Sequence, residues 1–382
     1  MKNIGILTWF KSSNYGTCLQ AYALSSFLRN NNYNAYLVEN LKFYYGLKNP
    51  IESIVALVNK YKNKLLKHPN SSIKFEDLPN DIKEKYLKRI KKNEDFAYTK
   101  NNVKVNYNKL DYERMLEETD IFITGSDQIW NPNYVSPSNL LAFASNHKKI
   151  AYASSIGVEH IPNNKKHIYK KYLSRFSKIG VREKTAQSEL STILKKDVVT
   201  VLDPTFLLNK GEWSKIIDKT VSEPLPDKKY IFCYFIGKNR EWEKQVKTFA
   251  EKNGYEVYCA LSESYILPDV GVLKPELGVE DFVNYLLNAD IVATDSFHAI
   301  ALSINFNKNF VAFKRFKDTD NKSQNSRIID ILSTFKLSNQ LIELNNSLEF
   351  STKEIDYSKS NEILKELRKY SKNFLIESIE EE

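Results

Sequence analysis

The chain has 382 residues, of which 42% are hydrophobic and 27% charged, a composition typical of a soluble globular protein. Its length exceeds what one hydrophobic core usually serves, so we expect two domains. No run approaches the roughly 20 apolar residues of a membrane span, and the N-terminus lacks a signal-peptide cleavage site. Three cysteines without a CxxC pair suggest neither a disulfide framework nor a zinc site, which predicts a cytoplasmic protein.

The net charge of +9 is concentrated in one segment. Residues 57–104 hold 13 Lys and Arg against 6 Asp and Glu, which gives 13 − 6 = +7. A solvated, lysine-rich helical face explains this charge most simply. Docking on an anionic membrane or a polyanionic acceptor is an alternative. No arginine-rich stripe, zinc finger or RNA-binding signature supports nucleic acid as a partner.

The first half of the chain alternates apolar runs with helical patterns, as a parallel α/β sheet does. The helix predicted between its first two strands covers residues 17–29. From residue 41 to about 110 a lysine-rich insertion of helices and loops interrupts the pattern. The predicted strands are Ile4–Phe10, Ala35–Glu39, Ile121–Gly125, Lys149–Ser154, Ile179–Arg182 and Val198–Leu202.

The same rhythm restarts after a polar, proline-bearing stretch at residues 218–229. We therefore predict two Rossmann-like domains facing a cleft, residues 1–215 and 216–350. Residues 351–382 form an amphipathic helix, capped by Ser360, that packs back on the first domain. The elements predicted in the second half are strands Tyr230–Ile236, Glu256–Leu261, 291–293 and Phe310–Phe313, and helices 241–253, 279–288 and one from 325.

The motif KSSNYGTCLQ, residues 11–20, joins the first strand to the first helix. Asn14, Tyr15 and Gly16 form a turn that brings backbone N–H groups and the helix N-terminus towards a ligand. The motif lacks the three glycines of a dinucleotide fingerprint and the Lys-Ser/Thr of a P-loop. An ordinary loop with a helix cap at residues 16–17 is the competing interpretation.

The motif TGSDQIWNP, residues 124–132, follows a predicted strand. Ser126, Asp127 and Gln128 place three hydrogen-bonding side chains at the strand end, and Trp130 lies beside them. Carbohydrate sites use this combination, since carboxylates and amides bind hydroxyls and an aromatic face covers the apolar side of a sugar ring. A polar turn with a core tryptophan explains the same residues without a ligand.

A strand end also carries Arg182, in the motif IGVREKTA. A guanidinium at this place can bind a carboxylate or phosphate in bidentate fashion. A surface ion pair, with Glu183 as companion, is the simpler interpretation of this residue.

The segment TDSFHAIALSINFNKNFVAFKRF, residues 294–316, is the most informative. One strand delivers Ser296 and His298 to a helix start, and the next ends at Lys314 and Arg315. Ligands of open α/β sheets bind beyond the carboxyl ends of the strands. The segment therefore predicts a site for a small, phosphate-bearing anion, with Arg327 as a further contact.

Taken together, these motifs resemble the polysaccharide pyruvyl transferase family. The resemblance runs from GILTWFKSSNYGTCLQAYAL through TGSDQIWNP, YASSIG, GVREKTA and LDPTFLL to TDSFHAIALSI and NSRI. It implies a fold like that of GT-B glycosyltransferases and transfer of a pyruvyl group from phosphoenolpyruvate to two hydroxyls of a sugar, which yields a cyclic ketal. It also implies phosphoenolpyruvate as co-substrate without a metal or organic cofactor, and a glycan acceptor, lipid-linked or not.

By motif position, Arg182 and His298 match residues that bind phosphoenolpyruvate in the family, and Lys314 or Arg315 supplies a further cation. We expect His298 as proton donor or phosphate ligand and Asp127 as general base. The sequence departs from the family pattern at one important place: many members carry Arg-x-His where this chain has Ser296-Phe297-His298. Two alternatives remain, a glycosyltransferase that uses a nucleotide-sugar donor and a non-catalytic carbohydrate-binding or membrane-associated protein.

Overall fold

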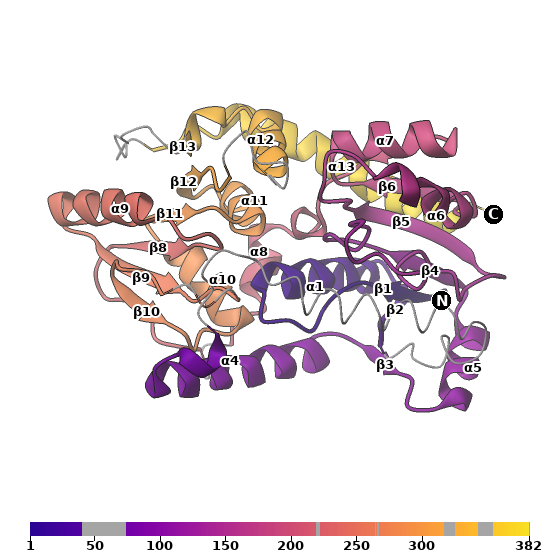
Figure 1. Cartoon of the computed structure of the whole chain (residues 1–382), viewed down its shortest axis with the longest axis horizontal. Helices are drawn as coiled ribbons and strands as arrows, with labels where there is room; N and C mark the ends of the chain where they lie inside the picture. Colours follow the sequence, from indigo (N-terminus) through magenta and orange to yellow (C-terminus); the bar gives the residue numbers. More distant parts are fainter. Residues whose placement is uncertain are drawn as a thin grey trace.

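The computed structural model describes most of the chain. The described residues form two parallel sheets flanked by helices (Figure 1). The described residues are 1–39, 74–218, 222–263, 265, 267–316, 325–342 and 354–381. Most of the first half of the lysine-rich insertion therefore lies outside the described residues.

The first sheet contains seven parallel strands in the order β3-β2-β1-β4-β5-β6-β7. Its strands are β1 Asn3–Leu7, β2 Asn34–Glu39, β3 Val103–Val105, β4 Ile121–Thr124, β5 Lys148–Ser154, β6 Lys178–Val181 and β7 Val199–Thr200. The helices of this half are α1 Tyr15–Asn30, α4 Asn80–Thr99, α5 Lys109–Glu118, α6 Asn163–Leu173 and α7 Lys184–Leu194, with the 3-10 turn η1 Phe75–Asp77.

The second sheet has six parallel strands in the order β10-β9-β8-β11-β12-β13. Its strands are β8 Tyr230–Tyr234, β9 Glu256–Ala260, β10 Val272–Lys274, β11 Ile291–Thr294, β12 Asn309–Phe313 and β13 Leu341–Ile342. The remaining helices are α8 Lys210–Ser214, α9 Arg240–Asn253, α10 Val279–Asn288, α11 Phe297–Asn305, α12 Asn325–Thr334 and α13 Ser358–Glu380, with the turns η2 Pro204–Phe206 and η3 Ser338–Gln340.

Counted along each half of the chain, the second sheet has the doubly wound strand order 3-2-1-4-5-6, and the first sheet has the same order with a seventh strand added at its end. The prediction of an α/β fold with two Rossmann-like halves is confirmed. The order reverses between β1 and β4 in the first sheet, and between β8 and β11 in the second. The predicted domain boundary at residue 215 falls between the last strand of the first sheet and the first strand of the second.

The two sheets share one hydrophobic core. Alternate residues of each strand point to opposite faces, and Ile4, Ile123, Phe232 and Val292 all belong to the shared inner core. Helices α1, α10, α11 and α13 contribute to the same core. The outer face of each sheet has a separate core, which contains Phe122 in the first sheet and Ile231, among others, in the second. The halves are therefore packed together rather than joined only by a linker.

Several predicted elements need correction. Helix α1 begins at Tyr15, two residues before the predicted start, because Asn14 caps it by accepting from the Gly16 amide at 3.0 Å. Strand β3 lies inside the insertion, where helices and loops were expected; strands β10 and β13 were also not predicted. All three are short strands at or near a sheet edge, with weak apolar patterns.

Helix α13 packs back on the first sheet, as predicted, but Ser360 does not cap it. The helix begins at Ser358, and the Ser360 hydroxyl donates to the carbonyl of Phe335 at 2.7 Å. Further along, the Ser371 hydroxyl accepts from the Leu202 amide at 2.9 Å. The helix thus starts against the second half of the chain and ends at the first sheet, where Glu380 pairs with Lys2 (Figure 1).

Helix α4 joins the two halves on the opposite side (Figure 1). Arg89 is fully buried, donates to the carbonyls of Ser13 and Leu261, and lies 4.2 Å from the ring centre of Tyr15. Lys92 pairs with Glu223 at 2.8 Å and with Asp281 at 2.9 Å. Two of the basic residues considered for membrane docking therefore bind within the protein instead.

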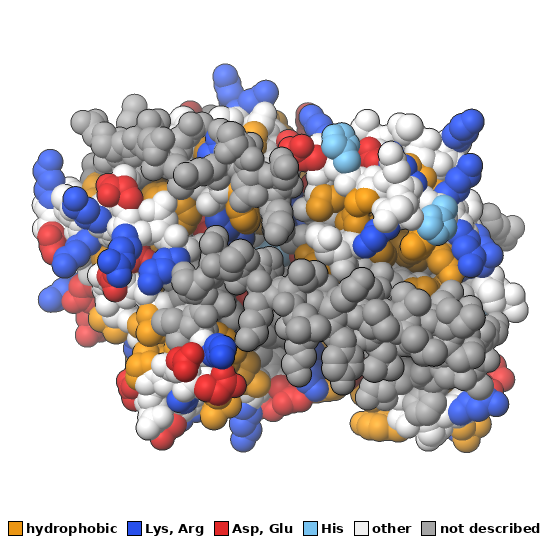
Figure 2. All heavy atoms as spheres, viewed as in Figure 1, with side chains coloured by type: hydrophobic (Ala, Val, Ile, Leu, Met, Phe, Trp, Pro, Cys, Tyr) orange, Lys and Arg blue, Asp and Glu red, His pale blue; other side chains and the backbone are white. Residues whose placement is uncertain are grey.

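The visible face of the molecule carries mixed charges. Where this face is described, Lys and Arg are interspersed with Asp and Glu and do not gather into one basic patch (Figure 2). Within the described ranges, no helix combines the length and hydrophobicity required to cross a membrane.

Replacing Arg89 by Met is expected to lower the free energy of unfolding by about 2 to 4 kcal/mol, since two buried carbonyls would lose a charged donor. Lys88→Met, on an exposed position of the same helix, is the matched control and is expected to stay within about 0.5 kcal/mol of wild type. Urea denaturation measures both. Equal losses in the two variants would contradict the bridging role of Arg89.

Candidate functional site

Polar side chains from both sheets meet at the carboxyl ends of the strands. In the first sheet, Asp127 follows β4, Arg182 follows β6 and Asp203 follows β7. In the second sheet, His298 follows β11 and Lys314 follows β12. The order of the parallel strands brings these ends to one edge of each sheet, as expected for ligand sites in doubly wound folds.

The centre of this cluster is the fully buried carboxylate of Asp203. Its Oδ2 accepts from Arg182 Nη1 at 3.0 Å and from Ser126 Oγ at 3.2 Å, and lies 3.7 Å from His298 Nε2. Its Oδ1 accepts from the backbone amide and hydroxyl of Thr205 at 3.0 and 2.8 Å. One carboxylate therefore links three strand ends of the first sheet to the first turn of α11 in the second half.

The surroundings hold Asp203 and His298 in definite protonation states. Burial alone would raise the pKa of Asp203, but His298, Arg182 and the donations from Thr205 keep that pKa below its ordinary value. Burial lowers the pKa of His298 below 6.5, and the attraction of Asp203 and Asp127 offsets this only in part. At neutral pH Asp203 is thus a carboxylate, and His298 is a neutral imidazole.

Arg182 keeps its charge in this buried place. Burial would lower the pKa of Arg182, yet Glu183 and Asp203 raise it above the ordinary value. Its Nε donates to Glu183 at 3.2 Å, and its guanidinium lies 4.4 Å from the ring centre of Phe297. Among the described residues, Nη2 of Arg182 has no hydrogen-bond partner. The charge is balanced, while one donor is still available to an acceptor.

The other cations differ in how they are held. Arg315 donates from Nε to Oδ2 of Asp295 and from Nη2 to the backbone carbonyl of Asp295, both at 2.7 Å. Asp295 therefore already balances the charge of Arg315. Burial, together with the nearby charge of Arg182, lowers the pKa of Arg327 to about 10. Lys314 is 7% exposed and donates its amide to the carbonyl of Ile342 at 3.0 Å. The effect of Arg182 on the pKa of Arg327 indicates that these two cations lie near enough to repel each other.

The N-terminus of α1 contacts His298 directly. A β-carbon at Gly16 would overlap the imidazole of His298, so only glycine permits this approach. Thr17 donates its hydroxyl to Asp127 Oδ2 at 2.8 Å. Gly125 is similarly constrained, because a β-carbon there would overlap the carbonyl of Tyr152. Glycine at these two turns lets the N-terminus of α1 approach His298, and lets the strand end before Asp127 pack closely against β5.

Two residues predicted to bind the acceptor are structural. Trp130 is fully buried in the outer core of the first sheet and donates to the carbonyl of Asn139 at 3.1 Å. Tyr15 is fully buried as well, stacks on Phe282 and donates its hydroxyl to the carbonyl of Leu277 at 2.8 Å. Neither ring presents a face to a ligand in this structure.

The remaining predicted residues lie in or beside the cluster. Asn14 caps α1 and donates to Glu263 at 3.1 Å. Ser126 is buried and donates to Asp203 and to the carbonyl of Ala153, at 3.0 Å to the latter. Gln128 accepts from Asn131 at 2.8 Å. Ser296 is 2% exposed, so its side chain is enclosed at the start of α11.

Sequence reasoning missed the residue at the centre of the site. Asp203 belongs to the motif LDPTFLL, for which no role was predicted. The signal was nevertheless present, because Asp203 follows a predicted strand just as Arg182 does. Glu183, expected as a companion of Arg182, is 5% exposed and also accepts from the Ser155 hydroxyl. Among the described residues, no group of three or more His, Cys, Asp or Glu could hold a metal ion.

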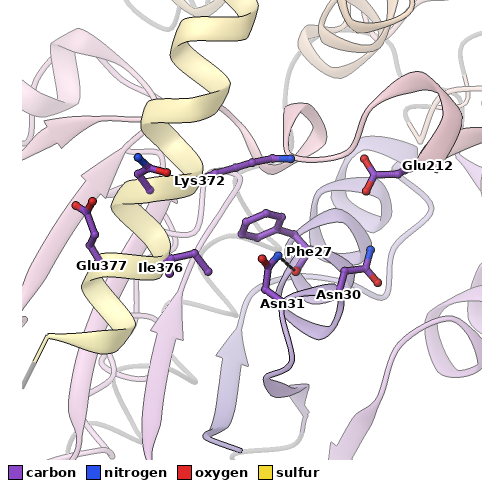
Figure 3. Close-up of a pocket in the computed structure, with 8 residues that line it drawn as sticks. Phe27, Asn30, Asn31, Glu212, Lys372, Ile376 and Glu377 are labelled. Atoms are coloured by element: carbon purple, nitrogen blue, oxygen red, sulfur yellow. Dashed lines mark hydrogen bonds between the residues drawn. The ribbon is translucent and has the colours of Figure 1, made fainter.

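A hollow of about 530 Å³ lies elsewhere, between α1, α8 and α13 (Figure 3). It borders the C-terminal end of α1, whereas the polar cluster borders the N-terminal end. A helix of 16 residues is about 24 Å long, so the two places are distinct. The hollow is lined by Phe27, Asn30, Asn31, Glu212, Lys372, Asn373, Ile376 and Glu377.

The fold and the cluster together define an α/β protein with a site built from strand ends of both sheets. Residues 14–315 match the family model of the polysaccharide pyruvyl transferases, which covers more than half of the chain. The protein therefore belongs to the polysaccharide pyruvyl transferase family and is a transferase. No curated protein matches the sequence.

Solved structures with low sequence identity resemble the whole chain. The MnaA–UDP structure from S. aureus has a TM-score of 0.45 at 14% identity and covers 97% of both chains. A UDP-GlcNAc 2-epimerase from Neisseria meningitidis, bound to UDP-GlcNAc, also has a TM-score of 0.45, at 9% identity, with 99% of this chain and 94% of that chain covered. The Streptomyces sp. SF2575 glycosyltransferase SsfS6 has a TM-score of 0.41 at 12% identity and covers 100% of both chains.

The folded-state pKa of His298 predicts how stability depends on pH. This pKa lies below the unfolded value of about 6.5, so the unfolded chain binds more protons as the pH falls through the window below 6.5. The contribution of neutral His298 to stability is fully present above that window and declines within it. The difference in unfolding free energy between wild type and His298→Gln should therefore shrink from about pH 8 to about pH 5. A constant difference would show that His298 is not buried as a neutral ring.

Proposed function

We propose that this protein transfers the pyruvyl group of phosphoenolpyruvate to two hydroxyls of one sugar in a cell-surface glycan or its precursor, which gives a cyclic ketal. One observation carries the proposal. In a chain of the pyruvyl transferase family, a buried carboxylate, Asp203, joins an imidazole and a guanidinium from different sheets at their carboxyl ends. That arrangement suits a small ligand with a carboxylate and a phosphate.

Arg182 and Arg327 are the proposed donor-binding cations, and Lys314, which follows β12, is a third candidate. The charge of Arg182 lowers the pKa of Arg327, and a bound anion between the two guanidinium groups would offset this effect. Arg315 contributes less, because Asp295 already balances its charge. Arg327 thus takes the place of the arginine that many family members carry where this chain has Ser296.

His298 is the proposed proton donor. It is neutral without a ligand, and the charge of phosphoenolpyruvate would favour the imidazolium and raise its pKa. Asp203 would stabilise that imidazolium, while Gly16 fixes the position of the ring. Binding of the donor would therefore also supply the proton that the reaction needs.

Asp127 is the proposed general base for the acceptor. Its Oδ2 accepts from Thr17 and its Oδ1 from the Gln128 amide at 2.8 Å, and these two bonds fix the carboxylate. Fixed in this way, it can take a proton from a sugar hydroxyl placed beside it. Asn14, Gly16, Ser126 and Gln128 shape this side of the site.

The atoms balance without an oxidant or a cofactor. C3 of phosphoenolpyruvate gains one proton and becomes a methyl group, and two sugar hydroxyls lose their protons. Two new C2–O bonds form to the sugar oxygens, and the C2–O bond to phosphate breaks. One of the two hydroxyl protons replaces the proton given to C3, and the other leaves with the phosphate.

The setting of the reaction is part of the same proposal. The protein would act in the cytoplasm on a glycan precursor as acceptor. If this acceptor is lipid-linked, the protein would act at the inner face of the membrane. Among the basic residues of α4, which lie in the segment considered for anionic lipid, Lys88 and Lys91 are exposed, while Arg89 and Lys92 bind within the protein.

Phosphoenolpyruvate should raise the melting temperature, and Arg327→Met should abolish this shift. A ligand at 100 times its dissociation constant stabilises by about 2.7 kcal/mol. Arg182→Lys is preferred to Arg182→Ala, because Ala would leave Asp203 and Glu183 buried without their cation. The Arg182→Lys variant should weaken the shift in melting temperature. Arg175→Met is the control, since Arg175 is exposed and precedes β6 rather than following it.

Uridine and guanosine diphosphates complete the panel. A shift with a nucleotide and none with phosphoenolpyruvate would overturn the proposal in favour of glycosyl transfer. Binding of phosphoenolpyruvate without phosphate release, across a panel of glycans, would favour a non-catalytic role.

Binding of phosphoenolpyruvate at about pH 7.5 should take up protons, because it raises the pKa of a neutral His298. The uptake should approach one proton per ligand at most, and affinity should fall as the pH rises. Isothermal titration calorimetry in two buffers of different ionisation enthalpy measures this proton uptake. His298→Gln should abolish the uptake, and an equal uptake in this variant would contradict the role of His298.

A further inference from the structure

Trp9 and Tyr134 form an exposed aromatic pair at the carboxyl edge of the first sheet. Their side chains are 36% and 45% exposed, and their ring centres lie 5.7 Å apart with a 52° angle between the planes. Trp9 follows β1, and Tyr134 lies in the loop that follows β4. These two strands border the point where the strand order reverses, next to the proposed site.

A buried glutamine fixes the base of this pair. Gln20 donates to the carbonyl of Trp9 at 2.7 Å and accepts from the amide of Ser126 at 3.1 Å. The backbone of Trp9 is thus tied to the loop that carries Asp127. Tyr134 is held in a turn by its amide, which donates to the carbonyl of Asn131 at 3.1 Å. The pair therefore has a defined place relative to Asp127.

The surroundings of Tyr134 connect the pair with the polar cluster. Its hydroxyl lies 3.5 Å from Oε1 of Gln128. The charges of Arg327, Asp127 and Glu263 all act on the Tyr134 hydroxyl. A ligand over the two rings would therefore lie within reach of the carboxylate proposed as general base.

We propose that Trp9 and Tyr134 form a stacking platform for a pyranose ring of the acceptor, held so that its hydroxyls face Asp127. This inference rests on the proposed function. An aromatic face beside carboxylates and amides matches a sugar, which has one apolar face and a rim of hydroxyls. The platform fulfils the role that the sequence suggested for Trp130.

Other exposed hydrophobic residues do not offer the same combination. Among the described residues, Tyr107 and Tyr370 are also exposed, but neither ring pairs with another described aromatic ring. Single apolar side chains at the surface are common and need no ligand to explain them. The paired rings beside a carboxylate distinguish the platform from these.

Tryptophan fluorescence tests the platform directly. Of the four tryptophans, Trp9 is 36% exposed, whereas Trp130, Trp213 and Trp242 are at most 2% exposed. Acrylamide quenching therefore reports chiefly on Trp9. With phosphoenolpyruvate present, at least one member of a panel of methyl hexopyranosides and hexose disaccharides should reduce the quenching. Sorbitol, which has no ring, should not. Protection that persists in Trp9→Phe, or no protection by any sugar, would overturn the platform.

Kinetics separate failure of the platform from failure of the proposed function. With the acceptor that gives the fastest phosphate release, Trp9→Ala and Tyr134→Ala should raise the acceptor KM about tenfold or more. Tyr134→Phe should keep most of the affinity, since it retains the ring. Tyr370→Ala removes an exposed ring from α13 and is the control. An unchanged acceptor KM in both alanine variants would overturn the platform while leaving pyruvyl transfer intact. Absence of a phosphoenolpyruvate shift in wild type would instead reject the proposed function.

Discussion

A buried carboxylate in a low-dielectric setting requires partners, and this requirement organises the molecule. Asp203 lies among hydrophobic strands and is 1% exposed, so its charge is stable only because Arg182, Ser126 and Thr205 donate to it. These donors belong to different strand ends, and His298 approaches from the second sheet. Placing all of them around one carboxylate fixes the relative position of the loops that build the site.

The arrangement around Asp203 depends on how the two sheets are held together. They share an inner core that includes α1, α10 and α11, and the two helices α4 and α13 bridge the halves on opposite sides. Tyr15 extends this packing to the site itself, because its hydroxyl binds a carbonyl of the second half. The N-terminus of α1 is consequently fixed against His298, with glycine at the contact.

The sequence predicted the architecture and much of the cluster for the same physical reason. Parallel strands, buried on both faces, appear as apolar runs, and the polar residues that follow them gather at one edge. This logic located Asp127, Arg182 and His298. Short edge strands such as β3 were missed because their residues are only half-buried and lack a clear pattern. Burial of the individual aromatic rings could not be predicted, since Trp9, at the end of a predicted strand, is exposed, whereas Trp130, in a polar turn, is buried. Nor could sequence spacing reveal that Arg89 and Lys92, in a lysine-rich helix, bind across to the second half.

The shared inner core has a consequence for how the chain unfolds. Two domains joined only by a linker can melt one after the other, each with its own transition. Here the inner faces of both sheets are covered by the same helices, and the C-terminal helix ends beside the N-terminal strand. Exposing the core of either half would expose the core of the other. We therefore expect the polypeptide to unfold as a single cooperative unit, in which Lys2 and Glu380 stabilise the same layer.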